Sequence, residues 1–591
     1  MITTHQLPEE AFTALARGDG DPAVVRHLSD VQRSKHLMLL HDIAAGAEGA
    51  GPGSPEIAAF RAGWELLVKV QEADPDAFAW VSGLPHIGAW AHDCLERKDR
   101  GLLPDLGYLA AAAVAAAVRA GVQFELDVPV KDGRVLLPGL GYFHGLGAGS
   151  WVRLRGDAER LTVGALTEAP RTALVPDGGS GDPVQHWQGT HAVRVVAEGR
   201  TWTVLLETGD RYLDRFALPM SAALTAKEVT SWQECIQSAW EVLVRHHGWA
   251  AGSIAAGVSV IIPLTAHGDT DLDSATTPAA FGAIATSLPP DPVIMAEILV
   301  HEFQHLKLCG LEDIAPLTEP SDERVYAPWR PDPRPVGGLL QGVYAHLGMA
   351  RFWAAQRHLE TDPDDILRAQ VMFERWRSMI EPVTATLLRT GRLTQPGARF
   401  VALLRDQGQR LESEVVPADV SAVARKVALD HRLTWQLRHT AIDATAVTDL
   451  ATAYQAGEPR SGRLLPEGRI EEDTRTVDPT TRSRLLNMRF LEPRRYSELS
   501  DAGLPGLSAA DRLLLSGQAS RAVRAYRDQI SAAPEPLAEA WTGLALAIHL
   551  LGQTPFLPAF DTGLPLMFDV HACLAARGIR SDPLELASWL G

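Results

Sequence analysis

The chain has 591 residues, of which 46% are hydrophobic and 22% charged, so it has the composition of an ordinary globular protein and not of a disordered chain. Its formal net charge of −18, with no basic block, argues against nucleic acid and against an anionic membrane as partners. Four scattered cysteines lack the spacing of an iron–sulfur cluster or a disulfide framework, and neither a secretion signal nor a long apolar stretch occurs, so we expect a cytoplasmic protein.

The amino-terminal part of the chain predicts helices followed by strands. Residues 1–122 have helical patterning, including an alanine-rich stretch at 109–118 that is typical of a buried packing helix. Between 123 and 222, alternating apolar residues, turn residues and glycine-rich loops indicate short strands. The glycines between 139 and 149 favour a flexible or bulged loop over a phosphate-binding loop, because a strand and not a helix follows them. We predict a helical region and then a β-rich region whose sheet could extend that of the next region.

Residues 223–400 form the third predicted region. A capping box of Thr225 and Glu228 opens a helix. Two short strands are expected at 257–264 and 281–287, and a strand beside the following helix would offer an edge for an extended peptide. The polar loop between them, residues 274–277, could line a site, but its composition favours a solvated loop.

The next helix carries the most informative motif of the chain. Start and stop signals predict a helix over 292–309, with Asp291 as its N-cap and Gly310 as a left-handed residue after its end. Within it, His301 and His305 lie four residues apart, so their imidazoles project from one face and can hold a single metal ion. Glu302, between them, is the catalytic residue in HExxH peptidases, where it acts as general base.

The third metal ligand departs from the common zinc peptidases. The metzincin pattern is excluded, because Leu311 stands where that pattern has its third histidine. The following helical segment, 335–358, contains no Asp or Glu but offers His346. Gly338, Gly342 and His346 are spaced four apart, which predicts a groove for close approach of the HExxH helix and favours His346 as the third ligand. The alternative is that His346 is a satisfied core residue.

A stiff, proline-rich segment at 326–335 connects the two helices and carries Arg330 and Arg334. Two guanidinium groups at a helix start could bind a small dicarboxylate. Equally, the two arginines could pair on the surface with Asp322, Glu323 or Asp332.

The fourth region, 401–591, is predicted to be helical. Residues 456–484 are polar and contain prolines, which suggests an exposed linker. The pattern from Gly517 to Gly552 resembles tetratricopeptide helices, which would bind a peptide or another protein, or would form a helical cap on the catalytic region. The whole chain is therefore predicted to be α+β and largely helical.

Three runs together resemble a known family. HEFQH at 301–305, YAPWR and DPRP within 326–335, and GGLLQGVYAHLG at 337–348 are similar to the HExxH-type 2-oxoglutarate-dependent peptide β-hydroxylases of bacterial gene clusters for ribosomally synthesised peptides. The resemblance implies an Fe(II) centre held by His301, His305 and His346, with 2-oxoglutarate and O2 as cosubstrates. It also implies that Tyr326 and one of the two arginines bind 2-oxoglutarate, and that a precursor peptide is hydroxylated at a side-chain β-carbon.

Three functions remain open at this point. In a hydroxylase, Glu302 would orient the metal site without acting as a base. A zinc metallopeptidase of the thermolysin-like class is the first alternative, and Glu302 would be its general base. A non-catalytic HExxH scaffold that binds peptides through its helical region is the second.

Overall fold

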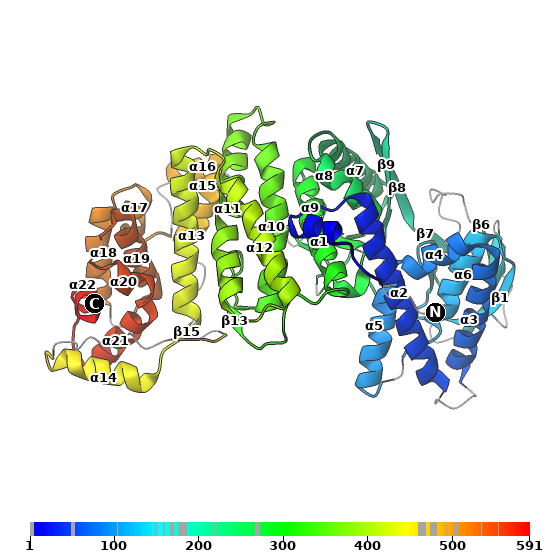
Figure 1. Ribbon diagram of the computed structural model, residues 1–591, viewed down its shortest axis with the longest axis horizontal. Coiled ribbons are helices and arrows are strands. Elements are labelled where there is room, and N and C mark those ends of the chain that lie inside the picture. Colours follow the sequence, from blue (N-terminus) through cyan, green and yellow to red (C-terminus); the bar gives the residue numbers. More distant parts are fainter. Residues whose placement is uncertain are drawn as a thin grey trace. The chain divides into compact units, whose positions relative to one another are not determined.

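The protein is mostly helical, with small sheets in its first half, which confirms the α+β class at this level (Figure 1). The computed structural model describes residues 5–48, 54–102, 104–147, 151–157, 160–165, 171–174, 186–216, 218–221, 223–265, 272–458, 468–472, 475, 481–491, 493–501, 506–533, 535–553 and 555–591. The chain divides into two compact units, residues 1–316 and 317–591. This division falls inside the region predicted at 223–400, so the HExxH helix belongs to the first unit and the helix of His346 to the second.

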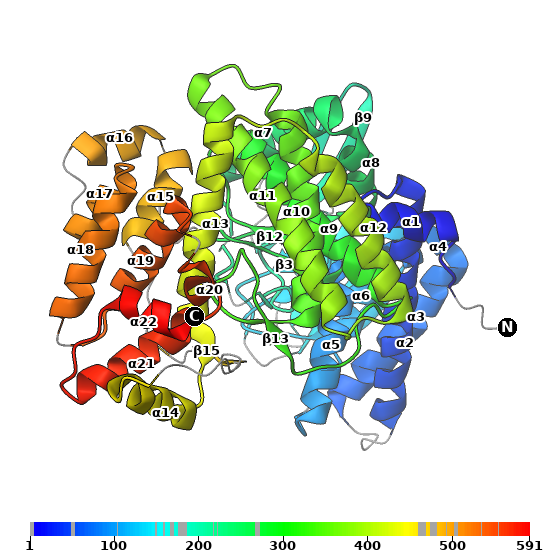
Figure 2. The ribbon, with the colours of Figure 1, turned by 60° about the vertical axis from the view of Figure 1, so that its left-hand side comes forward.

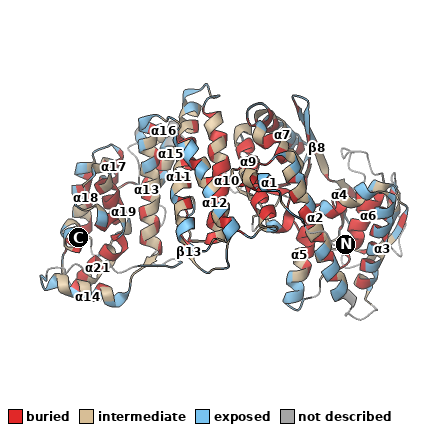
Figure 3. Ribbon diagram, viewed as in Figure 1, coloured by how far each residue is buried: buried red, intermediate tan, exposed pale blue. Residues whose placement is uncertain are grey.

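The first unit begins with a layer of helices and ends with the HExxH helix. Its helices are α1 (Glu9–Ala16), α2 (Pro22–Glu48), α3 (Pro55–Ala73), α4 (Pro75–Gly83), α5 (Pro85–Asp99), α6 (Tyr108–Ala120), α7 (Ala226–His246), α8 (Gly248–Gly257), the short 3-10 helix η1 (Pro278–Ala280) and α9 (Pro292–Glu312). The alanine-rich α6 is buried over nearly its whole length, as predicted, and its small side chains let α3 approach so closely that a Cβ at Gly63 would lie 2.7 Å from the Ala110 backbone (Figure 3).

Three sheets lie between these helices in the chain. Their strands are β1 (Phe124–Pro129), β2 (Val135–Leu137), β3 (Gly141–Phe143), β4 (Trp151–Gly156), β5 (Arg160–Ala165), β6 (Arg171–Leu174), β7 (Trp187–Gly189), β8 (His191–Ala197), β9 (Arg200–Leu206), β10 (Val260–Pro263), β11 (Ser274–Ala275) and β12 (Ala283–Thr286). The strand orders are β1-β4-β5-β6, β2-β3-β7 and β11-β12-β10-β9-β8. The last sheet joins β8 and β9 of the β-rich region to the two strands beside the HExxH helix, as the sequence suggested.

The five-stranded sheet mixes parallel and antiparallel pairs. β10 runs parallel to β12, with Val260 opposite Ala283, and also parallel to β9. Both central strands are buried on every residue, which explains why their sequences are apolar throughout and do not alternate. The two-residue strand β11 pairs antiparallel with β12 and forms one edge of the sheet.

The second unit is built from helical hairpins. Its elements are β13 (Arg324–Val325), β14 (Arg334–Pro335), α10 (Val336–Gln356), α11 (Pro363–Arg389), α12 (Gln395–Glu412), α13 (Ala418–His439), β15 (Thr440–Ala441), α14 (Ala444–Gln455), β16 (Arg469–Ile470), α15 (Thr481–Leu491), α16 (Pro493–Asp501), α17 (Ala509–Leu515), α18 (Ala519–Ala532), α19 (Ala538–Leu551), α20 (Leu557–Asp561), α21 (Leu564–Ala576) and α22 (Pro583–Leu590). Figure 2 shows α10, α11 and α12 packed side by side, followed by α13.

The helices around 509–551 pack on one another in chain order, while their resemblance to tetratricopeptide helices stays a prediction. α18 packs on α17 and α19, and Gly543 of α19 makes room for the ring of Tyr526, since a Cβ there would lie 2.3 Å from that ring. The expected exposed linker at 456–484 is wrong at its end, because α15 begins at Thr481 and Arg482 within it is fully buried. Its guanidinium binds Asp430 and Asp511 and so ties α13 to α17. Residues 459–467, 473–474 and 476–480 of that stretch lie outside the described residues.

Among the described residues, no helix combines the length and the apolar character that a membrane crossing requires.

Candidate metal-binding site

The HExxH helix α9 begins as its sequence predicts. The Asp291 carboxylate accepts a hydrogen bond from the backbone N–H of Val293 at 2.8 Å, and Pro292 is the first helical residue. The expected left-handed Gly310 is wrong, since α9 continues to Glu312 with Gly310 inside it. Gly310 instead allows close packing, because a Cβ there would lie 3.1 Å from the Phe281 ring and 3.3 Å from Leu28.

The rotation of α9 about its axis is fixed by buried contacts on one face. The Lys307 ammonium donates to the backbone carbonyls of Gly18 and Asp19, both at 2.9 Å, in the turn between α1 and α2. The ring of Phe303 packs against Gly257, where a Cβ would lie 2.6 Å from the ring. These contacts bury Phe303 and Lys307 and leave the half-buried His301 and His305 on a different face of the helix.

The two histidines of the motif come together on that half-buried face. Their ring centroids lie 4.9 Å apart, with an angle of 82° between the ring planes, and the His301 side chain is 22% exposed. Two accessible imidazoles on successive turns can each give one nitrogen to the same metal ion. Among the described residues, no group of three or more His, Cys, Asp or Glu side chains is gathered as a metal site would require. The described residues therefore bring together two candidate ligands, His301 and His305.

Glu302 is hydrogen-bonded to Ser274 of the edge strand β11. Its carboxylate is buried and accepts hydrogen bonds from the hydroxyls of Ser274, at 2.7 Å, and Thr276, while one of its oxygens lies 3.9 Å from Nε2 of His301. Burial raises the pKa of Glu302, against the opposing effects of His305 and of the two hydroxyls. The expectation of a solvated loop at 274–277 is therefore wrong for Ser274, which forms strand β11 and fixes a residue of the motif.

His346 is a buried residue of α10 in the second unit. It is 5% exposed, stacks on the Trp329 indole with ring centroids 4.4 Å apart, and lies against Trp376 at 4.5 Å. Its Nδ1 donates to the Gly342 carbonyl at 2.7 Å, so the lone pair of the neutral ring is on Nε2, the nitrogen that a metal would use.

That hydrogen bond does not by itself mark a ligand. His92 and His549 make the same bond to the carbonyl four residues earlier in their own helices. Because His346 belongs to the other unit, its assignment as third ligand stays a prediction.

The groove predicted along α10 is filled by Trp329 and Pro335, and not by the HExxH helix that was expected there. A Cβ at Gly342 would lie 2.2 Å from the Trp329 ring, and one at Gly338 would lie 3.3 Å from Pro335. The space that the glycines leave is thus filled by the connecting segment of the same unit. The interpretation of the glycine spacing as a surface for another helix is wrong for these two residues.

Arg330 and Arg334 both form ion pairs with Asp332, which lies between them in the sequence. Nε of Arg330 lies 2.9 Å from one oxygen of this carboxylate, and Nη1 of Arg334 lies 3.1 Å from the other. Although partial burial raises the pKa of Asp332, the two arginines outweigh it and lower that pKa overall. This is the surface-pairing alternative for the segment. It leaves one net positive charge on the three groups, at the start of α10.

Tyr326 points into the interior of the second unit. Its hydroxyl bonds to Nδ1 of His431 at 2.9 Å, and its ring packs edge-on against Trp435. Burial raises its pKa and lowers that of His431 to about 4, so both groups are neutral near pH 7. The side chain is already engaged within its own unit, and its predicted part in binding 2-oxoglutarate stays a prediction.

No protein-family model matches this chain, and no curated protein shows detectable similarity to it.

Proposed function

We propose that this chain is an Fe(II)- and 2-oxoglutarate-dependent dioxygenase that hydroxylates a side-chain β-carbon of a ribosomally synthesised peptide. The observation that carries the proposal is the pair of half-buried imidazoles, His301 and His305, whose ring centroids lie 4.9 Å apart on the face of α9 that the Lys307 contacts leave open. His346 remains the third ligand that the sequence resemblance suggests, and its Nδ1-protonated form is the one that could bind a metal.

The donor set suits iron. Imidazole nitrogen is a good ligand for Fe(II), and a ligand pair or triad leaves coordination positions for a bidentate 2-oxoacid and for O2. Bound Fe(II) would supply the oxidation of a C–H bond, coupled to the oxidative decarboxylation of 2-oxoglutarate to succinate. The cosubstrate's free carboxylate requires a cation, for which Arg330 and Arg334 are the candidates in this proposal.

The residues around Glu302 fit a positioning role. A carboxylate that accepts from two hydroxyls and is shielded from solvent is held rigidly beside His301. We assign it the task of keeping the two imidazoles in place. An extended peptide that paired with the edge strand β11 would lie next to Glu302, because Ser274 is in this strand and donates to the Glu302 carboxylate.

One observation favours a zinc metallopeptidase as the second candidate. An oxygen of the Glu302 carboxylate lies 3.9 Å from Nε2 of the proposed ligand His301, which is the placement that a general base beside a metal-bound water needs.

The two candidates are separated by comparing Glu302→Gln with His305→Ala. In a hydroxylase, the glutamine keeps one acceptor for the hydroxyls, so succinate formation and peptide oxidation persist at a reduced rate. In a peptidase, it removes the base and abolishes cleavage, a loss of about a thousandfold or more. His305→Ala abolishes metal binding in either case.

His92→Ala is the matched control, because His92 is also a half-buried histidine within a helix but lies on α5. It should retain full metal content and activity. If the native protein binds no metal and turns over neither cosubstrate nor peptide, the non-catalytic scaffold is the correct reading.

A further inference from the structure

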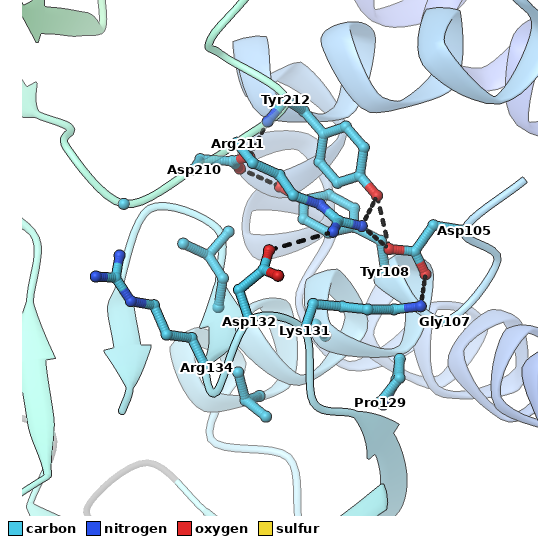
Figure 4. A pocket seen from close by; sticks show the side chains of 14 residues that line it. Asp105, Gly107, Tyr108, Pro129, Lys131, Asp132, Arg134, Asp210, Arg211 and Tyr212 are labelled. Carbon is cyan, nitrogen blue, oxygen red and sulfur yellow. Dashed lines mark hydrogen bonds and ion pairs between the residues drawn. The ribbon is translucent and has the colours of Figure 1, made fainter. Parts of the chain in front are cut away.

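The first unit contains a second site, a pocket of about 230 Å³ that no residue of α9 lines. It lies where three segments that are distant in the sequence meet: the start of α6, the turn between β1 and β2, and the loop after β9 (Figure 4). Ligand pockets for drug-sized molecules occupy roughly 300–1,000 Å³, so this one suits a small metabolite or a single side chain.

Three cationic side chains line the pocket: Lys131, Arg134 and Arg211. Arg211 is neutralised, because it contacts Asp105 directly and reaches Asp132 at 3.8 Å. Lys131 has only a long contact to Asp105, at 3.7 Å. These ion pairs lie on the right-hand side of the pocket in Figure 4 and engage two of its three lining carboxylates, Asp105 and Asp132; the third is Asp210.

Arg134 differs from the other two cations. Its guanidinium stacks over the Tyr142 ring, 4.9 Å from the centroid, and among the described residues no carboxylate forms an ion pair with it. Figure 4 shows it across the pocket from Asp105. The three lining cations are matched in number by three lining carboxylates, Asp105, Asp132 and Asp210. Arg134 is therefore distinguished by having no ion pair among the described residues, and not by an excess of positive charge in the pocket.

The start of α6 contributes a partial positive charge on one side of the pocket. The N-cap residue is Gly107, which has no side chain to cap the helix, and both Gly107 and Tyr108 line the pocket. The dipole of this thirteen-residue helix favours a negative charge at this end, and the backbone N–H groups of Leu109 and Ala110 already donate to the carbonyls of Leu106 and Gly107. A side chain at position 107 would not fit, because a Cβ there would lie 2.4 Å from Pro129.

The rest of the lining is apolar or aromatic. Pro129, Val135, Leu136 and the rings of Tyr108 and Tyr212 provide a surface for a short hydrocarbon chain. The tyrosine hydroxyls are already used, since Tyr212 donates to Asp105 at 2.6 Å and Tyr108 binds Asp210. These contacts shape the pocket and leave its anion-binding capacity to Arg134, Lys131 and the helix start.

The floor of the pocket is fixed by a buried polar network. Asp210 is buried, binds Tyr108, and accepts from the backbone N–H of Tyr212 at 2.8 Å. Behind it, His86 binds Glu207 at 3.1 Å, with both side chains almost fully buried. A pocket whose floor is tied to the interior in this way is preformed and would lose little entropy on binding a ligand.

We propose that this pocket binds the carboxylate of a small organic acid with a short apolar body, with Arg134 as the main anion-binding residue. The same chemistry is present in a free short-chain acid and in an acidic side chain of a peptide. The proposal does not depend on the metal site, since the pocket lies apart from the HExxH helix and uses none of its residues.

The test measures binding of pentanoate to the EDTA-treated full-length protein by calorimetry and ligand-observed NMR. Pentanamide, which has the same shape without the charge, is the ligand control. We expect pentanoate to bind and pentanamide not to bind. We expect Arg134→Gln to lower the affinity for pentanoate by about tenfold or more.

The control variant is Arg119→Gln. Arg119 is also an exposed arginine stacked on an aromatic ring, 4.7 Å from the centroid of Trp80, but it lines no part of this pocket. It should leave the affinity unchanged. Equal binding of pentanoate to both variants, equal binding of pentanamide, or no binding of any acid at about 20 mM would overturn the proposal.

Two acetylated peptides, one with a glutamate and one with a glutamine, identify the natural source. Displacement of pentanoate by the glutamate peptide alone supports an acidic side chain as ligand. Failure of both peptides, with pentanoate still bound, supports a free acid.

Discussion

Ser274 provides the sharpest test of how the motif helix is supported. Its hydroxyl donates to the buried Glu302 carboxylate at 2.7 Å, across 28 residues of sequence. A hydrogen bond to a charged group contributes about 1.5–3 kcal/mol, and losing it leaves a buried oxygen with one acceptor site unfilled. Ser274→Ala should therefore destabilise the contact between β11 and α9 by an amount in that range.

Because the chain has two units, global unfolding is not a single transition, and hydrogen exchange of peptides covering 299–309 is the suitable assay. A loss of 1.5–3 kcal/mol corresponds to roughly tenfold to hundredfold faster exchange of amides that open locally. We also expect metal affinity to fall by about ten- to a hundredfold, since the residue that positions His301 is loosened.

Ser54→Ala is the matched control. Ser54 makes the same bond at 2.7 Å to Glu56, but that carboxylate is only half-buried at the start of α3. Its loss should change local stability by less than about 0.5 kcal/mol. If the two alanine variants have equal effects, the burial of Glu302 does not strengthen its bond to Ser274 and the reasoning is wrong.

Three further predictions concern packing, pH and the third ligand. Gly342→Ala places a methyl group against the Trp329 ring and should cost about 1–3 kcal/mol, seen as faster exchange in α10, whereas an unchanged rate would show that the indole has room to move. Burial opposes the charges of His86 and Glu207, but their contact raises the pKa of His86 and lowers that of Glu207. The ion pair therefore stabilises the fold fully between pH 4.5 and pH 6.5, which are the ordinary pKa values of the two groups. This stabilisation is lost as the pH rises through the raised pKa of His86 or falls through the lowered pKa of Glu207. Glu207→Gln should cost about 3–5 kcal/mol at about pH 5.5 and less at about pH 9, as measured by exchange in β9, and a pH-independent cost would refute the charged pair. His346→Ala should remove bound iron and activity, and a variant with full iron content would exclude His346 as a ligand.

Local signals in the sequence predicted the elements well. The aspartate and proline at 291 and 292 predicted where α9 begins, and the capping box of Thr225 and Glu228 is formed in both directions at the start of α7. Such signals work because the groups involved lie within four residues of one another, so no tertiary contact decides the outcome.

The partners of these elements could not be predicted in the same way. Glycine spacing in α10 showed that something must approach closely, but not that the occupant is Trp329 of the preceding segment. Ser274 looked like an ordinary loop residue, because the carboxylate it contacts is distant in the sequence. The pocket around Arg134 has no motif at all, since its lining comes from three separate segments.

The most direct test of the central claim is a single-turnover reaction of the Fe(II)-reconstituted protein with 2-oxoglutarate, isotopically heavy O2 and the peptides encoded beside the gene. The account predicts that one heavy oxygen atom enters a side chain of the peptide for each succinate formed. Peptide fragments without any succinate, from protein that retains zinc, would contradict it.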